Sequence, residues 1–486
     1  MTQGKDRAEK ETGGPLYRKL AAYGESDYYG FHMPGHKRKT GNFRNPYSFD
    51  ITEIEGFDDL HHPEGDGILT KAQERAARLY KAEETHFLVG GSTAGILSAV
   101  SGCCHRGGRV LMARNCHRSV YHAAELGELE ATYLYPQQVP SLGINGAVCP
   151  EDVEKALAYD ERIEAVIITS PTYDGVCSDV RAIAGICHRH KAPLIVDQAH
   201  GAHFPFSDYF PEDAVSAGAD VVIHSVHKTL PALTQTALLH VQGKLANRER
   251  IRRFLSVYQS SSPSYVLMAS IDACVDLLER EGEELFCSHV KRLSAFRESC
   301  RELKTLYLAG KERIGEKAAD FDRSKLLVST GRAGITGSRL SGLLLERYHI
   351  QMEMAAPDYV VGIASVADTE EGFARLGRAL RELDAEFAGE PERLISAQTL
   401  GIPRLAARMT AGEAVEKEKE ACGLSDCVGR LSAEYVYLYP PGIPLIVPGE
   451  EITAEASGRI GDWLAAGLTV HGLDAAGKAV VIKERE

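Results

Sequence analysis

The sequence predicts an α/β protein with a mostly parallel sheet sandwiched by helices, and a smaller α+β part near the C-terminus. From residue 66 to about 260, short apolar runs alternate with helical patterns. This alternation is typical of parallel strands joined by right-handed crossovers. After a helical stretch near residues 270–305, a smaller strand–helix–strand pattern begins. We therefore expect an N-terminal arm over residues 1–65, a large domain over 66–310, and a small domain with a tail over 311–486.

Individual elements follow from apolar runs bounded by turn residues and from helical periodicity. In the large domain we expect strands at residues 85–89, 109–113, 164–169, 191–197 and 221–224, and helices at 93–100, 118–126 and 179–190. In the small domain we expect strands at 325–329 and 359–363, and helices at 338–348 and 370–387. Prolines between residues 439 and 448 are expected to form a rigid ordered loop, because proline does not fit helices or central strands.

Composition and charge exclude several classes of protein. The chain is 44% hydrophobic and 25% charged, which is typical of a soluble globular protein. Its net charge of −13 argues against a nucleic-acid partner, and no apolar run approaches the ~20 residues that span a membrane. The polar N-terminus has no signal-peptide core. Eleven irregularly spaced cysteines indicate reduced thiols, so we expect a cytoplasmic protein.

A lysine directly after a buried strand is the strongest chemical signal. Lys228 follows the apolar run at 221–224 and stands among Ser225, His227 and Thr229. An amine at the end of a buried strand can be deprotonated and form a Schiff base with an aldehyde cofactor. An exposed loop lysine would give the same local pattern. The residues at the other strand ends are therefore needed to distinguish a cofactor-binding lysine from a surface lysine.

Two other strand ends carry residues that suit such a cofactor, because ligands of open α/β sheets bind beyond the carboxyl ends of the strands. The turn at residues 90–95 offers the first amides of a helix, up to Ala94, and the hydroxyls of Ser92 and Thr93 for a phosphate. It lacks the Gly-Lys-Ser/Thr ending of a P-loop. Asp197 can pair with a protonated pyridine nitrogen, and the small Ala199 lets a ring lie flat. Asp197 could instead bind magnesium or cap a helix.

Histidines form the last group. His117 follows the strand at 109–113, where an imidazole can stack on a pyridine ring, although a lone histidine is more often structural. His200 with His203, and His224 with His227, form two His-x-x-His pairs. Both pairs lie at strand ends without a carboxylate or cysteine partner pattern, so we expect no metal site.

Together these motifs resemble the pyridoxal-phosphate-dependent decarboxylases of ornithine, lysine and arginine, in their short form without a receiver-like N-terminal domain. The resemblance covers nearly the whole chain. Its motifs are residues 31–37, 52–53, 58–61, 91–93, 114–117, 197–201, 227–230, 439–444 and 448–450. It implies an aspartate aminotransferase-like fold, a homodimer or larger homo-oligomer with shared active sites, and a role in polyamine biosynthesis. Within the family, the chain resembles bacterial biosynthetic arginine decarboxylases.

The resemblance also implies roles for single residues. Lys228 would form the Schiff base, Asp197 would face the ring nitrogen, and His117 would stack on the ring. His200 would lie against the cofactor. The phosphate would be held by Ser92, Thr93, Ser225 and His227. The second position of the motif at 197–200 is usually Glu; here Gln198 is expected to face away from the cofactor, with little effect on it.

The substrate implied by the resemblance is a basic amino acid, with arginine favoured and lysine or ornithine as alternatives. A buried cationic side chain needs carboxylate partners, and the candidates are Glu353, Asp358, Asp58 and Asp59, the last two from the arm of a neighbouring subunit or the same one. The stretch at 352–358 follows the family pattern only loosely. An aminotransferase or lyase of the same fold stays open, since fold does not fix the reaction; an aminotransferase needs an arginine for the α-carboxylate that the sequence does not locate.

Overall fold

The computed structural model describes residues 15–39, 45–48, 50–51, 57–62, 65–388, 401–439, 442–465 and 467–484. A seven-stranded sheet forms its centre, in the order β2-β11-β10-β9-β7-β3-β4. Within this sheet β11 alone runs opposite to the other strands. The strands are β2 (Glu84–Leu88), β3 (Arg109–Ala113), β4 (Glu130–Leu134), β7 (Ile163–Thr169), β9 (Leu194–Asp197), β10 (Val221–His224) and β11 (Ala237–Val241). The predicted mostly parallel sheet is confirmed.

Helices between the strands bury the sheet. One group of helices, α3, α4 and α8, packs together, and α5 packs against α6. Their bounds are α3 (Gly91–Cys103), α4 (Arg118–Leu126), α5 (Pro150–Tyr159), α6 (Val180–Arg189) and α8 (Arg248–Tyr258). Strands β9 and β10 are buried at every position, which explains why they read as unbroken apolar runs. Helix α2 (Ile68–Tyr80) precedes the sheet and packs on β2.

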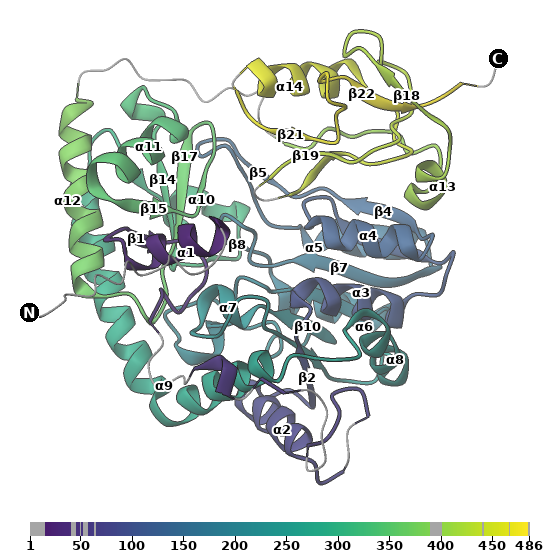
Figure 1. Cartoon of the computed structure of the whole chain (residues 1–486). Coiled ribbons are helices and arrows are strands. Elements are labelled where there is room, and N and C mark those ends of the chain that lie inside the picture. The colour runs from purple at the N-terminus through teal and green to yellow at the C-terminus, as the bar shows by residue number, and fades with distance from the viewer. Residues whose placement is uncertain are drawn as a thin grey trace, which may run out of the picture.

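The long helix α9 (Tyr265–Ser299) leads into a smaller, four-stranded sheet (Figure 1). Its order is β12 (Tyr307–Leu308), β14 (Lys325–Ser329), β17 (Tyr359–Ile363) and β16 (Met354–Ala355). Helices α11 (Gly337–Tyr348) and α12 (Glu370–Glu386) pack beside it. The arm joins this part, because β1 (Tyr29–Phe31), after α1 (Pro15–Glu25), pairs in parallel with β15 (Ile350–Met352).

Short two-stranded pairs complete the first 388 residues. They are β5 (Gln138–Val139) with β6 (Ile144–Asn145), and β8 (Val176–Cys177) with β13 (Asp320–Phe321). Helices α7 (Val226–Thr229) and α10 (Lys311–Ile314) are single turns. Since β8 belongs to the large part and β13 to the small one, their pairing ties the two parts together. The predicted domain boundary at residue 310 stays a prediction.

The C-terminal part has a hydrophobic core of its own, which includes Ile446, Ile460 and Val481. Its elements are α13 (Ala411–Val415), β18 (Lys419–Cys422), β19 (Val436–Leu438), β20 (Pro444–Ile446), α14 (Ala454–Ala465), β21 (Val470–His471) and β22 (Ala479–Ile482). Figure 1 shows this yellow part beside the β4 edge of the large sheet. The prediction of a loop for the prolines between residues 439 and 448 is wrong at Pro444, because this residue begins the edge strand β20. Proline is tolerated there, since the first residue of an edge strand has no ladder bond to donate.

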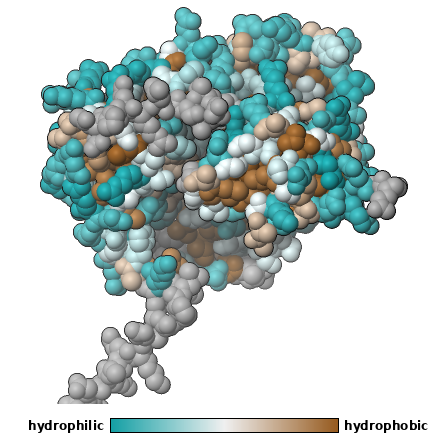
Figure 2. Space-filling view, turned by 90° about the horizontal axis from the view of Figure 1, so that it is seen from above, coloured by the Kyte–Doolittle hydropathy of each residue, from teal (hydrophilic) through white to brown (hydrophobic). Residues whose placement is uncertain are grey.

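The face seen from above carries teal hydrophilic residues over most of its area, with apolar residues gathered in separate brown areas (Figure 2). Among the described residues, no helix combines the length and apolar character that a membrane crossing requires. The eleven cysteines are all free.

A buried arginine fastens the C-terminal part to the large sheet. Arg114 follows β3 and is fully buried. Its guanidinium donates to the carbonyl oxygens of Pro444 and Leu445 and lies 3.2 Å from a carboxylate oxygen of Glu450. Two of the sequence motifs, 114–117 and 448–450, therefore meet in space although more than 300 residues separate them.

We predict that Glu450→Ala lowers the free energy of unfolding by about 3 kcal/mol, because it leaves the buried charge of Arg114 unpaired. The measurement is chemical denaturation followed by fluorescence. The control is the neighbouring Glu451→Ala, whose partner Arg408 is exposed, and which should cost less than about 1 kcal/mol. Equal effects of the two substitutions would contradict the anchoring role of Arg114.

Candidate active site

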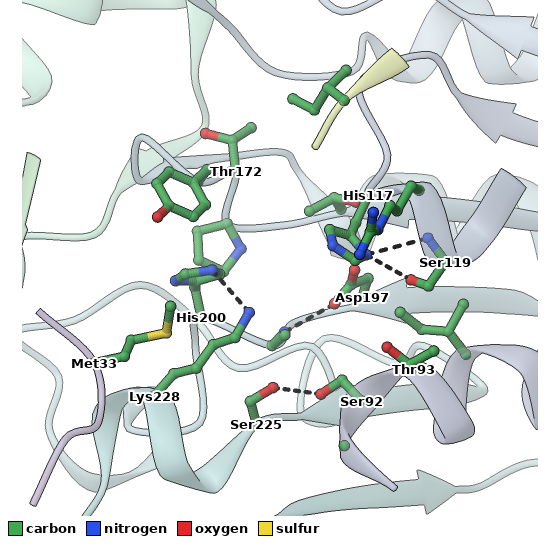
Figure 3. Close-up of a pocket in the computed structure, with 18 of the residues that line it drawn as sticks. Met33, Ser92, Thr93, His117, Ser119, Thr172, Asp197, His200, Ser225 and Lys228 are labelled. Carbon is green, nitrogen blue, oxygen red and sulfur yellow. Dashed lines mark hydrogen bonds between the residues drawn. The ribbon is translucent and has the colours of Figure 1, made fainter. Parts of the chain in front are cut away.

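A cavity of about 500 Å³ lies where the loops after the parallel strands converge. Strands β3, β7, β9 and β10 are neighbours and run in the same direction, so their carboxyl ends share one edge of the sheet. Three of the predicted site residues, His117, Asp197 and Lys228, come from three of these strand ends. Figure 3 shows their side chains around one space. The cavity is also lined by Met33, Ser92, Thr93, Asn115, Arg118, Thr172, Tyr173, Asp174, Ala199, His200, Ser225, His227, Glu353 and Tyr439.

Lys228 lies on the one-turn helix α7 directly after β10. Its Nζ is 3.1 Å from Nε2 of His200 (Figure 3). Burial lowers the pKa of Lys228, while the charges of Asp197 and Glu353 raise it. Desolvation is the larger of these effects, so the environment shifts the amine towards its neutral form, which is the nucleophilic one.

Asp197 ends β9 and is only 4% exposed. Its carboxylate accepts a hydrogen bond from the backbone N–H of Ala199 at 3.1 Å. Burial raises the pKa of Asp197, and the nearby Lys228 lowers it. Such a carboxylate suits a cationic N–H partner, because a buried charge is stable only when it is paired. The small side chain of Ala199 lines the same cavity.

His117 caps helix α4. Its Nδ1 accepts from the backbone N–H of Ser119, so the ring proton of the neutral imidazole is on Nε2. Burial, followed by the charge of Lys228, lowers the pKa of His117 to about 4. The ring is therefore neutral at pH 7, and a neutral ring can stack on an aromatic ligand without a charge to desolvate.

The start of α3 forms a cradle whose groups suit an anion. No side chain caps this helix, and Gly91, with φ +70°, turns the backbone into it. The hydroxyls of Ser92 and Ser225 meet in a hydrogen bond at its first turn (Figure 3). Thr93 lines the cavity one residue further on, and the amide of Ala94 belongs to the same turn. Unpaired amides, hydroxyls and the helix dipole together suit a phosphate group.

The expected role of His227 as a phosphate ligand stays a prediction. Its Nδ1 donates to the carbonyl oxygen of Thr236 at 2.7 Å, so the neutral ring presents a bare Nε2. Burial lowers its pKa to about 4. His227 can donate to a phosphate only when the anion raises that pKa enough to protonate the ring.

Two carboxylates besides Asp197 line the cavity. Glu353, which precedes β16, accepts from the backbone N–H of Met33 at 2.8 Å and from the hydroxyl of Tyr173 at 2.6 Å. Asp174 accepts from the hydroxyl of Tyr359 at 2.8 Å. Burial raises the pKa of Asp174, and Lys325 lowers it. The pair places two carboxyl groups on this side of the cavity, where a cationic side chain needs such partners.

The other predicted substrate residues lie elsewhere in the described chain. Asp58 caps α2, where it accepts from the backbone amides of Leu69 and Thr70. Asp59 bonds to the N–H of His61 and to the ring of His62. Neither lines the cavity, and neither does the buried Asp358. Thr52 and Glu53 of the arm motif, and Pro440 and Pro441, lie outside the described residues.

The histidines of the two His-x-x-His pairs have separate partners. His203 pairs with Asp322, and His224 bonds to Gln198 and to His240. Gln198 thus points into this buried network and does not line the cavity, as the strand alternation predicts. Within the described ranges, no group of three His, Cys, Asp or Glu side chains gathers as metal ligands would.

Sequence reasoning missed several residues of the cavity. Tyr173 and Asp174 follow β7, and the rule that identified Asp197 at a strand end would have found them. Arg118 is the one arginine among the described cavity-lining residues, and it donates to the hydroxyl of Tyr437. Nothing in the local sequence indicates Lys325, which does not line the cavity but is fully buried and contacts Nδ1 of the lining residue His200.

These groups fit a phosphorylated pyridine aldehyde. A buried amine, a buried carboxylate, a neutral imidazole and a phosphate cradle surround one cavity. Fold and site together define the class of protein: the chain has the fold of pyridoxal-phosphate-dependent transferases, and its cavity holds groups that suit the cofactor of that class.

Comparison with known proteins gives the family. Residues 14–330 match the Orn/Lys/Arg decarboxylase major domain, and residues 395–470 match the C-terminal domain of the same proteins. The chain belongs to the Orn/Lys/Arg decarboxylase family, and it is an amino acid decarboxylase.

The relatives agree with this assignment. An arginine decarboxylase of Halalkalibacterium halodurans is 35% identical over 97% of this chain and 98% of its own length. An arginine decarboxylase of Bacillus subtilis is 34% identical over 94% of this chain and 95% of its own length. Among solved structures, lysine decarboxylase A from Pseudomonas aeruginosa superposes with a TM-score of 0.76 at 21% identity, over 96% of this chain and 80% of that one.

Proposed function

We propose that the protein decarboxylates arginine to agmatine and CO2 with pyridoxal 5'-phosphate attached to Lys228. The single observation that carries this proposal is the placement of Lys228 and Asp197 in one cavity with two further carboxylates, Glu353 and Asp174. Arginine is favoured because three relatives at 33–35% identity are named arginine decarboxylases, whereas three named lysine decarboxylases are 23–24% identical.

Several residues of the cavity have distinct proposed roles toward the cofactor. Asp197 would hold a proton on the ring nitrogen by charge pairing, and the cradle of Ser92, Thr93 and Ser225 would anchor the phosphate. His117 would lie against the ring as a neutral imidazole. When bound, pyridoxal phosphate supplies the electron sink for the pair of electrons that CO2 leaves at Cα.

Glu353 and Asp174 are the proposed partners of the substrate cation. A planar guanidinium presents five donors and suits two carboxylates better than a point-like ammonium does. Glu353 is fixed by Met33 and Tyr173, so its position is set before the substrate arrives. Roles for Asp58, Asp59 and Asp358 stay predictions; those of the two arm residues depend on a neighbouring subunit.

We also propose a cytoplasmic homodimer or larger homo-oligomer that acts in polyamine biosynthesis. Support comes from the family and from the eleven free cysteines, which suit a reducing compartment.

The first prediction about function concerns the lysine to which the cofactor is attached. Lys228→Ala should abolish covalent trapping of the cofactor by borohydride, because it removes the amine that forms the bond. Peptide mapping by mass spectrometry locates the trapped group in the unsubstituted protein. Trapping that persists at another lysine, for example Lys325, would show that the site is assigned incorrectly.

The second prediction separates catalysis from binding. Asp197→Ala should lower kcat by about 10²–10³, since it removes the partner of a charge that develops in the transition state. Cofactor content, measured by absorbance, should fall much less, because the phosphate cradle is intact. Near-normal turnover in this variant would refute the role of Asp197.

The third prediction tests the substrate. Release of CO2 and amine should be faster from L-arginine than from L-lysine or L-ornithine. Glu353→Gln keeps the volume but removes the charge, and should lower kcat/KM for arginine by about 10²-fold, as expected for a desolvated charge pair. Asp152→Asn, which removes an exposed carboxylate beside Lys155, serves as the control. Faster decarboxylation of a neutral or acidic amino acid would contradict the proposal.

A further inference from the structure

His200 lies between two lysines. Its Nε2 is 3.1 Å from Nζ of Lys228, and its Nδ1 is 2.6 Å from Nζ of Lys325. The ring is 6% exposed and Lys325 is fully buried. The two lysines come from different sheets, since Lys228 follows β10 of the large sheet and Lys325 begins β14 of the small one.

The hydrogen-bonding rules of imidazole constrain this trio. A neutral imidazole has one N–H and one lone pair, so it cannot accept from two ammonium groups at once. Burial, followed by the charges of Lys228 and Lys325, holds the pKa of His200 well below its ordinary value, which excludes the imidazolium form at pH 7. At least one of the two amines must therefore be neutral and accept from the ring N–H.

Geometry indicates which amine carries the charge. Nζ of Lys325 lies 2.6 Å from Nδ1 of His200, which is 0.5 Å shorter than the 3.1 Å between Nζ of Lys228 and Nε2. Hydrogen bonds from ionised donors are shorter than those from neutral donors. The Nζ of Lys325 also lies 5.6 Å from the centre of the Tyr173 ring, a cation–π distance.

Burial is the largest effect on Lys325 and, with the charge of Lys228, lowers its pKa to about 8, while the charges of Asp322, Glu353 and Asp174 oppose this shift. At pH 7 the ammonium form of Lys325 therefore still predominates. Asp322 is itself fixed by the hydroxyl of Ser324 and by His203. Gly175 makes room for the stem of Lys325, because a Cβ there would lie 2.8 Å from Cγ of Lys325.

We propose that Lys325 is a positioning residue for Lys228. Its ammonium donates to Nδ1 of His200, which fixes the ring proton on Nε2, and this N–H donates to the neutral amine of Lys228. The small sheet thereby holds the cofactor-binding lysine of the large sheet in its reactive form. This inference rests on the proposed function, in which Lys228 binds pyridoxal phosphate.

The test is the pH dependence of cofactor attachment. The full chain, freed of cofactor, is mixed with pyridoxal 5'-phosphate, and the rate of borohydride-trappable attachment to Lys228 is measured from acid to alkaline pH. The rate requires the neutral amine, so it rises with pH through the pKa of Lys228. Lys325→Met should move the midpoint upward by about one unit, and should slow attachment about tenfold at pH 7 with an unchanged alkaline plateau.

A structural role for Lys325 would give another result. It would lower the plateau or the stability without moving the midpoint, and that outcome would overturn the proposal. The matched control is Lys37→Met, since Lys37 is also a buried lysine, 4% exposed, but bonds to the carbonyl oxygens of His32 and Ile363. Its midpoint should equal that of the unsubstituted protein, and an equal shift in both variants would count against Lys325.

A double substitution tests the route through His200. In a His200→Ala background, Lys325→Met should produce less than a third of its original midpoint shift. A full shift in this background would mean that Lys325 acts by its charge alone, which would refute the role of the imidazole.

One measurement needs no substitution. In the full chain labelled with ¹⁵N-histidine, the NMR shifts of His200 should report a protonated Nε2 and an accepting Nδ1, and the reverse tautomer would overturn the proposal even if Lys325→Met failed to fold. If the unsubstituted protein attaches no cofactor at Lys228, the proposed function fails, and this inference fails with it. If attachment is normal but Lys325→Met leaves its midpoint unchanged, only the role of Lys325 is lost.

Discussion

The site depends on the parallel arrangement of four neighbouring strands. Because β3, β7, β9 and β10 run in the same direction, the loops after them reach one edge of the sheet. His117, Asp197 and Lys228 lie far apart in the chain and meet only for this reason. A strand reversed within this group would carry its functional residue to the opposite edge.

Burial determines the charge states at this edge. Desolvation lowers the pKa of Lys228 and raises that of Asp197, so each is pushed towards its neutral form. Their mutual attraction opposes both shifts. A ligand that brings its own cationic nitrogen to Asp197 would take the place of Lys228 as charge partner. The cofactor-free site is therefore electrostatically matched to such a ligand.

The C-terminal part contributes to the site through anchored segments. Arg114, at the end of β3, binds the backbone at residues 444 and 445 and the carboxylate of Glu450. The segment that carries Tyr439 and Ile443 is thereby held against the cavity that these two residues line. An ion pair without solvent contact holds one geometry well, because separation of its partners leaves a buried charge unpaired.

The sequence by itself determined the central elements and the residues at strand ends. The strands at 109–113 and 221–224 and the helix at 118–126 were predicted at their observed bounds, because apolar periodicity and turn residues are local signals. Lys228, Asp197, His117 and the cradle around Ser92 could be found because each directly follows a strand. Strand β4 was not predicted, because its alternating polar and apolar residues do not form the continuous apolar run by which the other strands of this sheet were found.

Only the tertiary structure decided which distant groups complete the site. Of the four carboxylates predicted for the substrate, the fold brings Glu353 into the cavity, while Asp58 caps a helix. Lys325 enters through a contact between two sheets, where its Nζ meets Nδ1 of His200, 125 residues earlier in the chain. Such contacts depend on how the sheets pack, and packing is set by the summed burial of many side chains. The packing of the two sheets therefore cannot be inferred from any single stretch of the sequence.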